Sequence, residues 1–185
     1  PPFDEPSRIR TIISADLDND GYDEVFLNNI GEPNKLFKIL DDGAFQQIPI
    51  DVGLEPDGYG TGAAVADIDN DGILELLVSH GESVDQPLSL YKAKVNPNNK
   101  YLRIKPLNKY GAPARGATVT LISNLRKHSK TIDSGSGYLC QMEPVAHYGI
   151  RKNEEDIKIQ IKWTNGKIKT VSINELNQTI TLKQK

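Results

Sequence analysis

Apolar and polar residues alternate along most of this chain, which predicts short β-strands rather than helices. From Ile157 to Trp163 every second residue is apolar. A period of two places one set of side chains in a core and the other set in water. Asn165-Gly166 comes shortly after this run and predicts a type I′ hairpin turn into residues 168–171. Further runs of this kind predict strands at residues 101–105, 117–122 and 178–182.

The first half has similar short apolar runs, arranged in two similar units. Each unit has one run before an Asp-rich loop, one run after it, and then a third. The runs are residues 10–15, 25–29 and 35–40 in the first unit, and residues 62–66, 76–80 and 88–92 in the second. The loops begin at Asp16 and Asp67, 51 residues apart. A repeat of this length suits the four-stranded blade of a β-propeller.

The two loops, residues 16–24 and 67–75, share the string D-x-D-N-D-G-x-x-E. Glycine at the sixth position allows a tight turn without a Cβ penalty. Carboxylates gathered this closely repel one another unless a cation lies between them, and Ca²⁺ is the cation that prefers oxygen ligands. The predicted ligands are Asp16, Asp18, Asp20 and Glu24 with the carbonyl of Tyr22, and Asp67, Asp69, Asp71 and Glu75 with the carbonyl of Ile73.

Two alternatives to these calcium loops remain. An EF-hand loop begins in the same way, but it needs a Glu at position 12 and helices on both sides. Position 12 is Leu27 in the first loop and Val78 in the second, and the flanking runs favour strands. The other alternative is a pair of acidic β-turns that bind no metal. The occurrence of the same string twice favours the calcium hypothesis over plain turns.

The charge distribution predicts two domains within the 185 residues. Residues 1–92 hold 5 Lys and Arg against 19 Asp and Glu, a net charge of −14, whereas residues 93–185 hold 17 against 6, a net charge of +11. Because a half-chain at −14 repels itself, we expect the stability of the first half to depend on calcium. No apolar run is long enough to span a membrane, which predicts the absence of a membrane span.

Residues 60–72, from Gly60-Thr61-Gly62 through the second Asp-rich loop, resemble the FG-GAP or VCBS-type repeat. The resemblance implies a β-propeller blade whose Asp-rich hairpin loop binds calcium. The family usually has Asp at the ninth loop position, where Glu24 and Glu75 stand here. Two blades leave sheet edges and apolar faces uncovered, so we expect this chain to be part of a longer propeller-containing chain, or else to seal its two units against its second half.

Three segments of the second half, residues 110–117, 135–149 and 163–166, resemble the ASPIC/UnbV domain, which follows FG-GAP repeats in its family. The predicted fold is therefore all-β. It has a partial propeller of two FG-GAP-type blades in residues 1–92 and a β-sandwich-like ASPIC/UnbV domain in residues 93–185.

Candidate catalytic chemistry is sparse. His147, near Glu143, Ser136 and Asp133 in sequence, invites a hydrolase hypothesis, but there is no G-x-S-x-G nucleophile elbow, and a buried, hydrogen-bonded histidine is the simpler interpretation. Cys140, the single cysteine, has apolar neighbours and is expected to be a buried structural thiol. Asn177 begins a glycosylation sequon, a pattern that also occurs by chance. The chain is therefore predicted to have no catalytic residues and not to be an enzyme.

The predicted function is a secreted or surface-exposed calcium-binding module for adhesion or recognition, with two Ca²⁺ ions that stiffen the hairpin loops. It would be extracellular, or located in the periplasm or at the cell surface if the source is bacterial. The basic second half would bind an extracellular protein or an anionic polysaccharide, or would simply be solvated and attracted to the acidic first half. Nucleic-acid binding is not expected, since the basic residues lack interleaved aromatics. The alternative is a polysaccharide-acting lyase or hydrolase with structural calcium.

Overall fold

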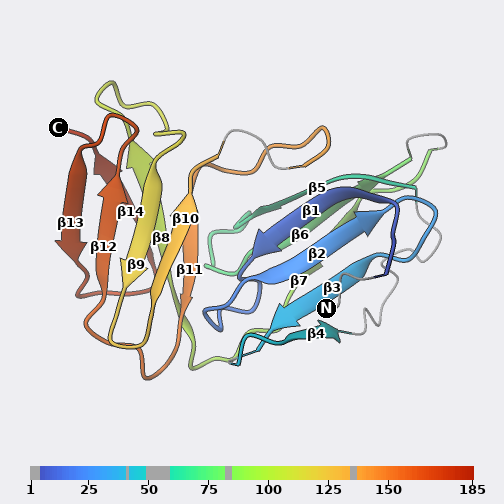
Figure 1. Ribbon diagram of the computed structural model, residues 1–185, viewed down its shortest axis with the longest axis horizontal. Helices are drawn as coiled ribbons and strands as arrows, with labels where there is room; N and C mark the ends of the chain where they lie inside the picture. Colours follow the sequence, from blue (N-terminus) through green and yellow to red (C-terminus); the bar gives the residue numbers. More distant parts are fainter. Residues whose placement is uncertain (1–4, 41, 49–58, 82–84, 134–136) are drawn as a thin grey trace. The chain divides into compact units, whose positions relative to one another are not determined.

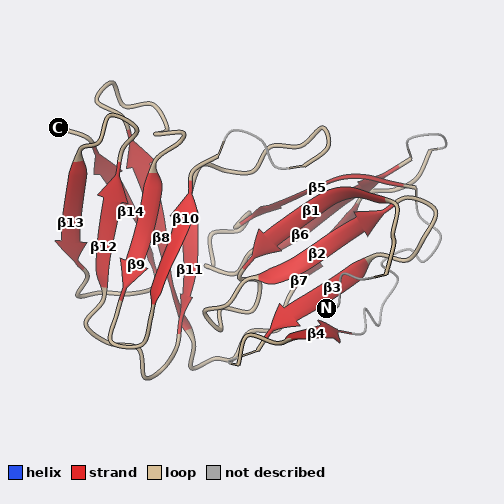
Figure 2. Cartoon of the chain, in the orientation of Figure 1, coloured by secondary structure: helices blue, strands red, loops and turns tan. Residues whose placement is uncertain are grey.

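The computed structural model describes residues 5–40, 42–48, 59–81, 85–133 and 137–185. These residues form strands, turns and loops without a helix, as Figure 2 shows, so the predicted all-β fold is confirmed. Among them no segment forms a helix that could cross a bilayer. The described ranges contain fourteen strands, namely β1 (Ile9–Ala15), β2 (Glu24–Asn29), β3 (Lys35–Ile39), β4 (Phe45–Ile48), β5 (Gly60–Ala66), β6 (Glu75–His80), β7 (Ser89–Lys92), β8 (Lys100–Leu107), β9 (Thr118–Ile122), β10 (Lys127–Thr131), β11 (Ala146–Ile150), β12 (Lys158–Lys162), β13 (Ile168–Ser172) and β14 (Gln178–Lys183).

The chain divides into two compact units. Unit 1 contains Pro1–Leu17, Tyr22–Lys94 and Gly135–Met142, and unit 2 contains Asp18–Gly21, Val95–Ser134 and Glu143–Lys185. Each unit therefore consists of segments that are not consecutive in the sequence. The predicted domains, residues 1–92 and 93–185, are parts of the chain that would each fold independently. This boundary stays a prediction.

Unit 1 contains two antiparallel sheets, each a meander of consecutive strands. Strands β1 to β4 lie side by side in one sheet and β5 to β7 in the other (Figure 1). The two sheets share one core, because alternate residues on their facing strands are buried. That core contains Ile13, Ala15, Leu17, Phe26, Ala63, Val65, Leu74, Leu76 and Val78. A four-stranded meander such as β1–β4 is the form of a propeller blade, which agrees with the expected partial propeller.

Each Asp-rich loop joins the first two strands of its sheet, as predicted. The first loop connects Ala15 to Glu24, which pair across the hairpin, and the second connects Ala66 to Glu75 in the same register. The acidic residues therefore leave and re-enter the sheet at equivalent positions in the two units. The structure excludes the helices that an EF-hand requires on either side of its loop.

Unit 2 is a β-sandwich. Its layers are the sheets β10-β9-β12-β13 and β11-β8-β14, in which β14 pairs with β8 in parallel (Figure 1). Both layers contribute to one core, with Leu102 and Tyr148 from one sheet and Leu121 and Ile159 from the other. The inward side of the β12 hairpin is the predicted one, and the Trp163 indole N–H donates to the Leu107 carbonyl at 3.0 Å.

The turn after Trp163 differs from the prediction. In the Asn165-Gly166 pair only Gly166 has a positive φ, 84°, whereas a type I′ turn needs positive φ at both central residues. Instead the Gly166 N–H donates to the Trp163 carbonyl, and the Trp163 N–H donates to the carbonyl of Lys167. This pattern belongs to a three-residue hairpin loop with glycine at its left-handed position.

Three strands were missed by the alternation pattern, and each has a different reason. Strand β4 is mostly exposed, so it carries no buried face that would mark it. Strand β10, with the sequence KHSKT, has no apolar residue that could mark a buried face. All five residues of β11 are buried, so this strand has no polar alternation at all.

Candidate metal centre

The first Asp-rich loop gathers three carboxylates. One oxygen each from Asp16, Asp18 and Glu24 lies within 4.8 Å of the other two, close enough to hold one metal ion. Asp16 is 1% exposed and Glu24 3% exposed, so two of the three acidic side chains are withdrawn from water. Withdrawal of several negative charges from water is costly unless a cation or a set of hydrogen-bond donors compensates them.

Left-handed backbone at two positions curls this loop. Asn19 has φ 57° and Gly21 has φ 91°, and the equivalent Asn70 and Gly72 in the second loop have φ 61° and 83°. Glycine adopts positive φ freely, and asparagine tolerates it better than most residues. The N-D-G part of the string therefore sets the backbone path that turns the carboxylates toward one point.

The glutamate at the ninth position closes both loops. In the first, the Leu17 N–H donates to Glu24 Oε2 at 2.8 Å, and in the second the Ile68 N–H donates to Glu75 Oε2 at 2.7 Å. Each glutamate thus ties the second loop position to the outgoing strand through one oxygen. The longer side chain of Glu, compared with the Asp usual in the family, suits this bond across the loop.

The second loop gathers carboxylates in the same way but closer to solvent. Oxygens of Asp67, Asp69 and Asp71 lie within 4.8 Å of one another, and only Asp67 of these three is buried. Backbone donors hold all three carboxylates in place: the Gly72 N–H donates to Asp67 at 3.1 Å, the Asp71 N–H to Asp69 at 3.3 Å, and the Ile73 N–H to Asp71 at 2.9 Å. The two loops therefore share a backbone path and differ in exposure.

A lysine, not predicted from the sequence, lies in the second loop's cluster. The Lys92 Nζ is 2.8 Å from Asp69 Oδ2, 2.9 Å from Asp71 Oδ2 and 2.5 Å from Glu75 Oε1. Hydrogen bonds to Asp69 and then Glu75 are the main reasons why the pKa of Lys92 is raised above its ordinary value, and the Lys92 ammonium in turn lowers the pKa of Asp69. The acidic cluster is thus a place where a positive charge is stabilised.

The donor set fits a hard cation such as Ca²⁺, because both clusters offer only carboxylate oxygens. Not every predicted ligand belongs to them. Asp20 and Glu75 lie outside the two three-residue clusters, whereas Tyr22 and Ile73 were predicted to offer only backbone carbonyls. The Asp20 N–H donates to Asp18 Oδ1 at 3.1 Å, so this residue braces a cluster member through its backbone. The complete ligand set therefore stays a prediction.

The tip of the first loop, Asp18–Gly21, belongs to unit 2 and is bonded to other residues of that unit. The Asn19 Oδ1 lies 2.7 Å from Nε2 of His147, and the Arg151 Nε–H donates to the Asp20 carbonyl at 2.6 Å. Gly21 packs so closely against the Arg126 guanidinium that a Cβ at this position would lie 2.7 Å from its Nη1. Position 21 therefore requires glycine both for its φ and for this close approach.

His147 is buried, as the non-catalytic interpretation expected. It is 4% exposed, and burial together with the positive charges of Lys130 and Arg103 lowers its pKa to about 3. Of the acids near it in sequence, Glu143 pairs with Arg103, and Asp133 offers its carbonyl to Arg115. Ser136 lies outside the described residues. A buried, neutral imidazole bonded to Asn19 weighs against the hydrolase hypothesis.

Cys140 is only partly buried, and not fully as expected. Burial nevertheless raises the pKa of its thiol above the ordinary value. A Cβ placed on Gly62 would lie 2.3 Å from the Cys140 sulfur, so the segment with Cys140 packs closely on β5. A raised thiol pKa and close packing are the properties of a structural rather than a reactive cysteine.

Comparison with known protein families matches both parts of the chain. Residues 16–78 match the FG-GAP-like repeat, and residues 108–185 match the family described as ASPIC and UnbV. The chain combines FG-GAP-like repeats with an ASPIC and UnbV domain. Both resemblances expected from the sequence motifs are confirmed, and so is their order along the chain.

Curated relatives match nearly the whole chain. Cartilage acidic protein 1 of Homo sapiens is 42% identical over 193 residues, which cover 98% of this chain and 29% of the relative. Cartilage acidic protein 1 of Xenopus tropicalis is 47% identical over 182 residues, which cover 94% of this chain and 28% of the relative. The FG-GAP-like and ASPIC/UnbV pair described here thus spans less than a third of the length of these relatives.

Proposed function

We propose that this chain is a calcium-binding adhesion or recognition module of an extracellular protein. The observation that supports the proposal is the recurrence of one arrangement. At the equivalent hairpin of both FG-GAP-like sheets, three carboxylates converge on one point above a loop that Glu closes. Plain surface turns need no such convergence, because acidic side chains on a free turn spread apart to reduce repulsion.

The residues of each loop have separate roles in this proposal. Asp16, Asp18 and Glu24 in the first loop and Asp67, Asp69 and Asp71 in the second would bind the ion, and the left-handed Asn and Gly positions keep the carboxylates directed inward. A bound Ca²⁺ supplies positive charge and links the two strand ends through its oxygen ligands. The glutamate clamp keeps each loop closed around its site.

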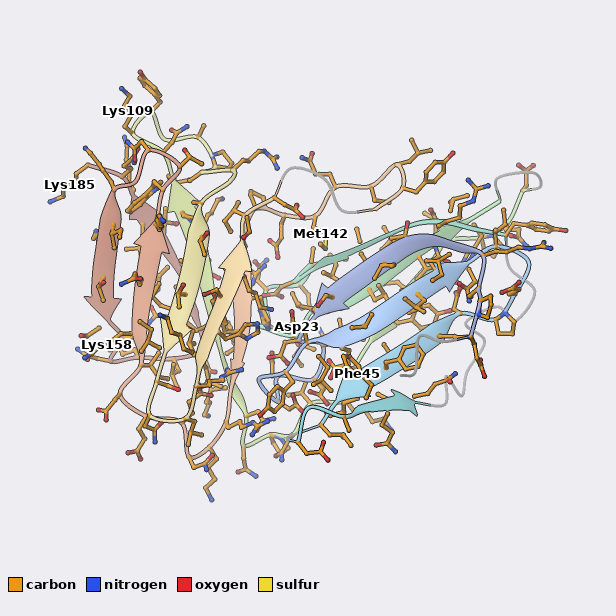
Figure 3. The ribbon with its side chains drawn as sticks, viewed as in Figure 1. Asp23, Phe45, Lys109, Met142, Lys158 and Lys185 are labelled. Atoms are coloured by element: carbon orange, nitrogen blue, oxygen red, sulfur yellow. The ribbon has the colours of Figure 1, made fainter. Side chains whose placement is uncertain are left out.

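The proposal also specifies a class of binding partner and an extracellular location for this chain. The ASPIC/UnbV domain carries the basic excess, with Lys109 and Lys185 at one end of the sandwich and Lys158 at the other (Figure 3). Such a surface suits an acidic extracellular protein or an anionic polysaccharide. The enzymatic alternative, a lyase or hydrolase acting on polysaccharide, has no specific observation in its favour, because His147 is buried.

Thermal unfolding with and without calcium tests this function. Free calcium at about a hundredfold above its Kd stabilises a one-site protein by about 2.7 kcal/mol, or roughly 5–10 °C for a chain of this size. We expect such a rise for the wild type and a smaller one for Asp18→Asn, which weakens the first cluster with little change in shape. Asp85→Asn removes the same charge outside both clusters and is expected to respond like the wild type. Coincident curves with calcium and with chelator would contradict the proposal.

A further inference from the structure

Two adjoining hollows lie at one end of the β-sandwich of unit 2, where β8, β12 and β14 end. The first has a volume of about 280 Å³, and its polar walls come from Asn108, Arg115, Thr164 and Gln184. The second has a volume of about 350 Å³ and is lined by Trp163, Lys167, Ile168, Lys169, Gln184 and Lys185. Trp163 and Gln184 line both hollows, so the two are neighbours that one extended ligand can occupy together.

The two shared residues give the hollows a fixed floor. Trp163 is 5% exposed, and its indole N–H is bonded to the Leu107 carbonyl. Gln184 is 8% exposed; its main-chain N–H donates to the same carbonyl at 3.0 Å, and its side-chain amide donates to Asn165 Oδ1 at 2.8 Å. Because both side chains are buried and bonded to neighbouring residues, the hollows exist before any ligand arrives, as is usual for binding sites.

Positive charge is concentrated around the hollows. Among the described residues that line them none is acidic, and the cationic ones are Arg115, Lys167, Lys169 and Lys185. The Arg115 Nη1–H donates to the Asp133 carbonyl at 2.9 Å. A neutral carbonyl orients the guanidinium without cancelling its charge. A concave surface lined by charges of one sign attracts ligands of the opposite sign, so the hollows favour an anion.

A braced loop borders the first hollow. The Asn108 Oδ1 accepts the N–H of Tyr110 at 2.9 Å and the N–H of Ala112 at 3.1 Å, which fixes the chain directly after β8. The loop exposes Lys109 and the ring of Tyr110, which is 81% exposed, with the Lys109 Nζ 4.8 Å from the ring centroid. Figure 3 shows Lys109 at the same end of the sandwich as Lys185. The loop thus adds an exposed aromatic surface and a further cation beside the hollows.

We propose that these hollows bind an anionic polysaccharide, a chain of sugars that carry carboxylate or sulfate groups. Such a chain repeats its negative groups along its length, so it meets the cations of both hollows at once and gains from each contact. Its hydroxyl groups suit the polar side chains of Asn108, Thr164 and Gln184. The inference rests on the proposed recognition role of this module and specifies the site and the ligand. It involves no residue of the Asp-rich loops.

The composition of the hollows favours a polysaccharide over an acidic protein. Protein interfaces are enriched in aromatic residues and Arg and depleted in Lys, whereas the second hollow has Lys167, Lys169 and Lys185 as its cations. Protein interfaces also rely on large anchor residues inserted into pockets of the partner. The Trp163 ring is too deeply buried to be such an anchor. The surface therefore suits a ligand that is bound by charge and hydrogen bonds.

Titration of the 185-residue chain with a heparin oligosaccharide tests the proposal, followed by calorimetry and by the fluorescence of Trp163. This residue is the single tryptophan of the sequence, so a shift of its emission reports on the hollows. We expect saturable binding that weakens as salt rises, because salt screens exposed charges. Arg115→Gln combined with Lys169→Gln removes one cation from each hollow and is expected to weaken binding about tenfold, since two close charge pairs are lost.

A second pair of substitutions controls for net charge. Lys100→Gln combined with Lys158→Gln also removes two positive charges, but from the first residues of β8 and β12, at the other end of the sandwich. This variant is expected to bind heparin like the wild type. Lys167→Gln combined with Lys185→Gln is the alternative test variant if the Arg115 and Lys169 pair unfolds.

Each outcome decides a different part of the inference. Equal weakening by both pairs of substitutions would show binding by net charge alone and would overturn the site. Tighter binding of poly-glutamate than of heparin, lost in the Arg115 and Lys169 variant, would assign the hollows to an acidic protein and overturn the ligand. Absence of heparin binding, together with a rise in unfolding temperature in calcium, would overturn this inference and leave the calcium proposal standing. Heparin binding at the hollows without any calcium response would overturn the calcium proposal alone.

Discussion

At the scale of single residues, His147 is a histidine whose pKa is strongly lowered by its surroundings. It is enclosed in unit 2, with its Nε2 at 2.7 Å from Asn19 Oδ1 and its ring stacked on Tyr101. Burial, with nearby Lys130 and Arg103, lowers its pKa to about 3, so the imidazole is neutral at physiological pH. The residue thus stabilises the fold only in its unprotonated form.

This burial predicts a loss of stability in mild acid. The pKa of His147 in the folded chain, about 3, lies below that of an unfolded histidine near 6.5, so between these pH values the unfolded chain binds more protons. The free energy of unfolding should therefore fall as pH decreases from about 6.5, by up to about 1.4 kcal/mol per pH unit from this group. Urea unfolding at pH 7, 6 and 5 measures the slope. His147→Gln, which cannot titrate, should show a smaller slope, and parallel profiles would disprove the assignment.

At the scale of elements, the two layers of the sandwich are joined by a polar bond inside the apolar core. Tyr148 on β11 is 1% exposed, and its hydroxyl donates to the Val119 carbonyl on β9 at 2.8 Å. Strand β11 belongs to one sheet and β9 to the other, so the bond fixes their facing positions. A directional contact of this kind restricts sliding of sheets that apolar packing alone permits.

Removal of this hydroxyl should weaken the sandwich. Tyr148→Phe keeps the ring and leaves a polar carbonyl with one partner fewer, so we expect the free energy of unfolding to fall by about 1 kcal/mol. Urea unfolding followed by the fluorescence of Trp163, which lies in the same core, reports on this domain. Tyr110→Phe deletes a hydroxyl from a residue that is 81% exposed and should change stability little. Equal effects of the two substitutions would show that the bond contributes nothing specific.

At the scale of the whole molecule, a net charge of −3 conceals −14 in residues 1–92 and +11 in residues 93–185. The acidic residues of the FG-GAP-like part are concentrated where two loops gather their carboxylates. Mutual repulsion there acts against folding in the absence of divalent cations. The lysines of β3 and β7 reduce this repulsion locally, as the contacts of Lys38 and Lys92 show.

Salt should therefore replace calcium in part. In excess chelator, a rise from about 10 mM to 0.1 M sodium chloride shortens the Debye length from about 30 to 10 Å and should raise the unfolding temperature by a few degrees. With calcium bound, less repulsion remains to be screened, so the same change in salt should have a smaller effect. Scanning calorimetry at both salt concentrations measures the difference. An equal salt response with and without calcium would contradict electrostatic coupling between the loops and stability.

The sequence alone determined the all-β class and the position of both Asp-rich hairpins, because alternation and turn chemistry are local signals. Strands β1, β2, β5 and β6 lie where the apolar runs predicted them, and Gly21 and Gly72 have the positive φ that the loop string requires. Family motifs in the sequence likewise identified both parts of the chain, and the family comparison matches residues 16–78 and 108–185.

Only the tertiary structure decided which residues far apart in the sequence lie side by side, because local signals carry no information on such pairing. The parallel pairing of β14 with β8 and the fully buried β11 depend on partners far away in sequence. The same is true of Lys92, which lies 17 residues after Glu75 and meets it only because the strands pair. The sequence shows that Lys38 and Lys92 both follow a leucine and an aromatic residue, but it does not show which carboxylates the two lysines contact. Charge compensation acts across space, so only the folded sheet shows which lysine meets which carboxylate.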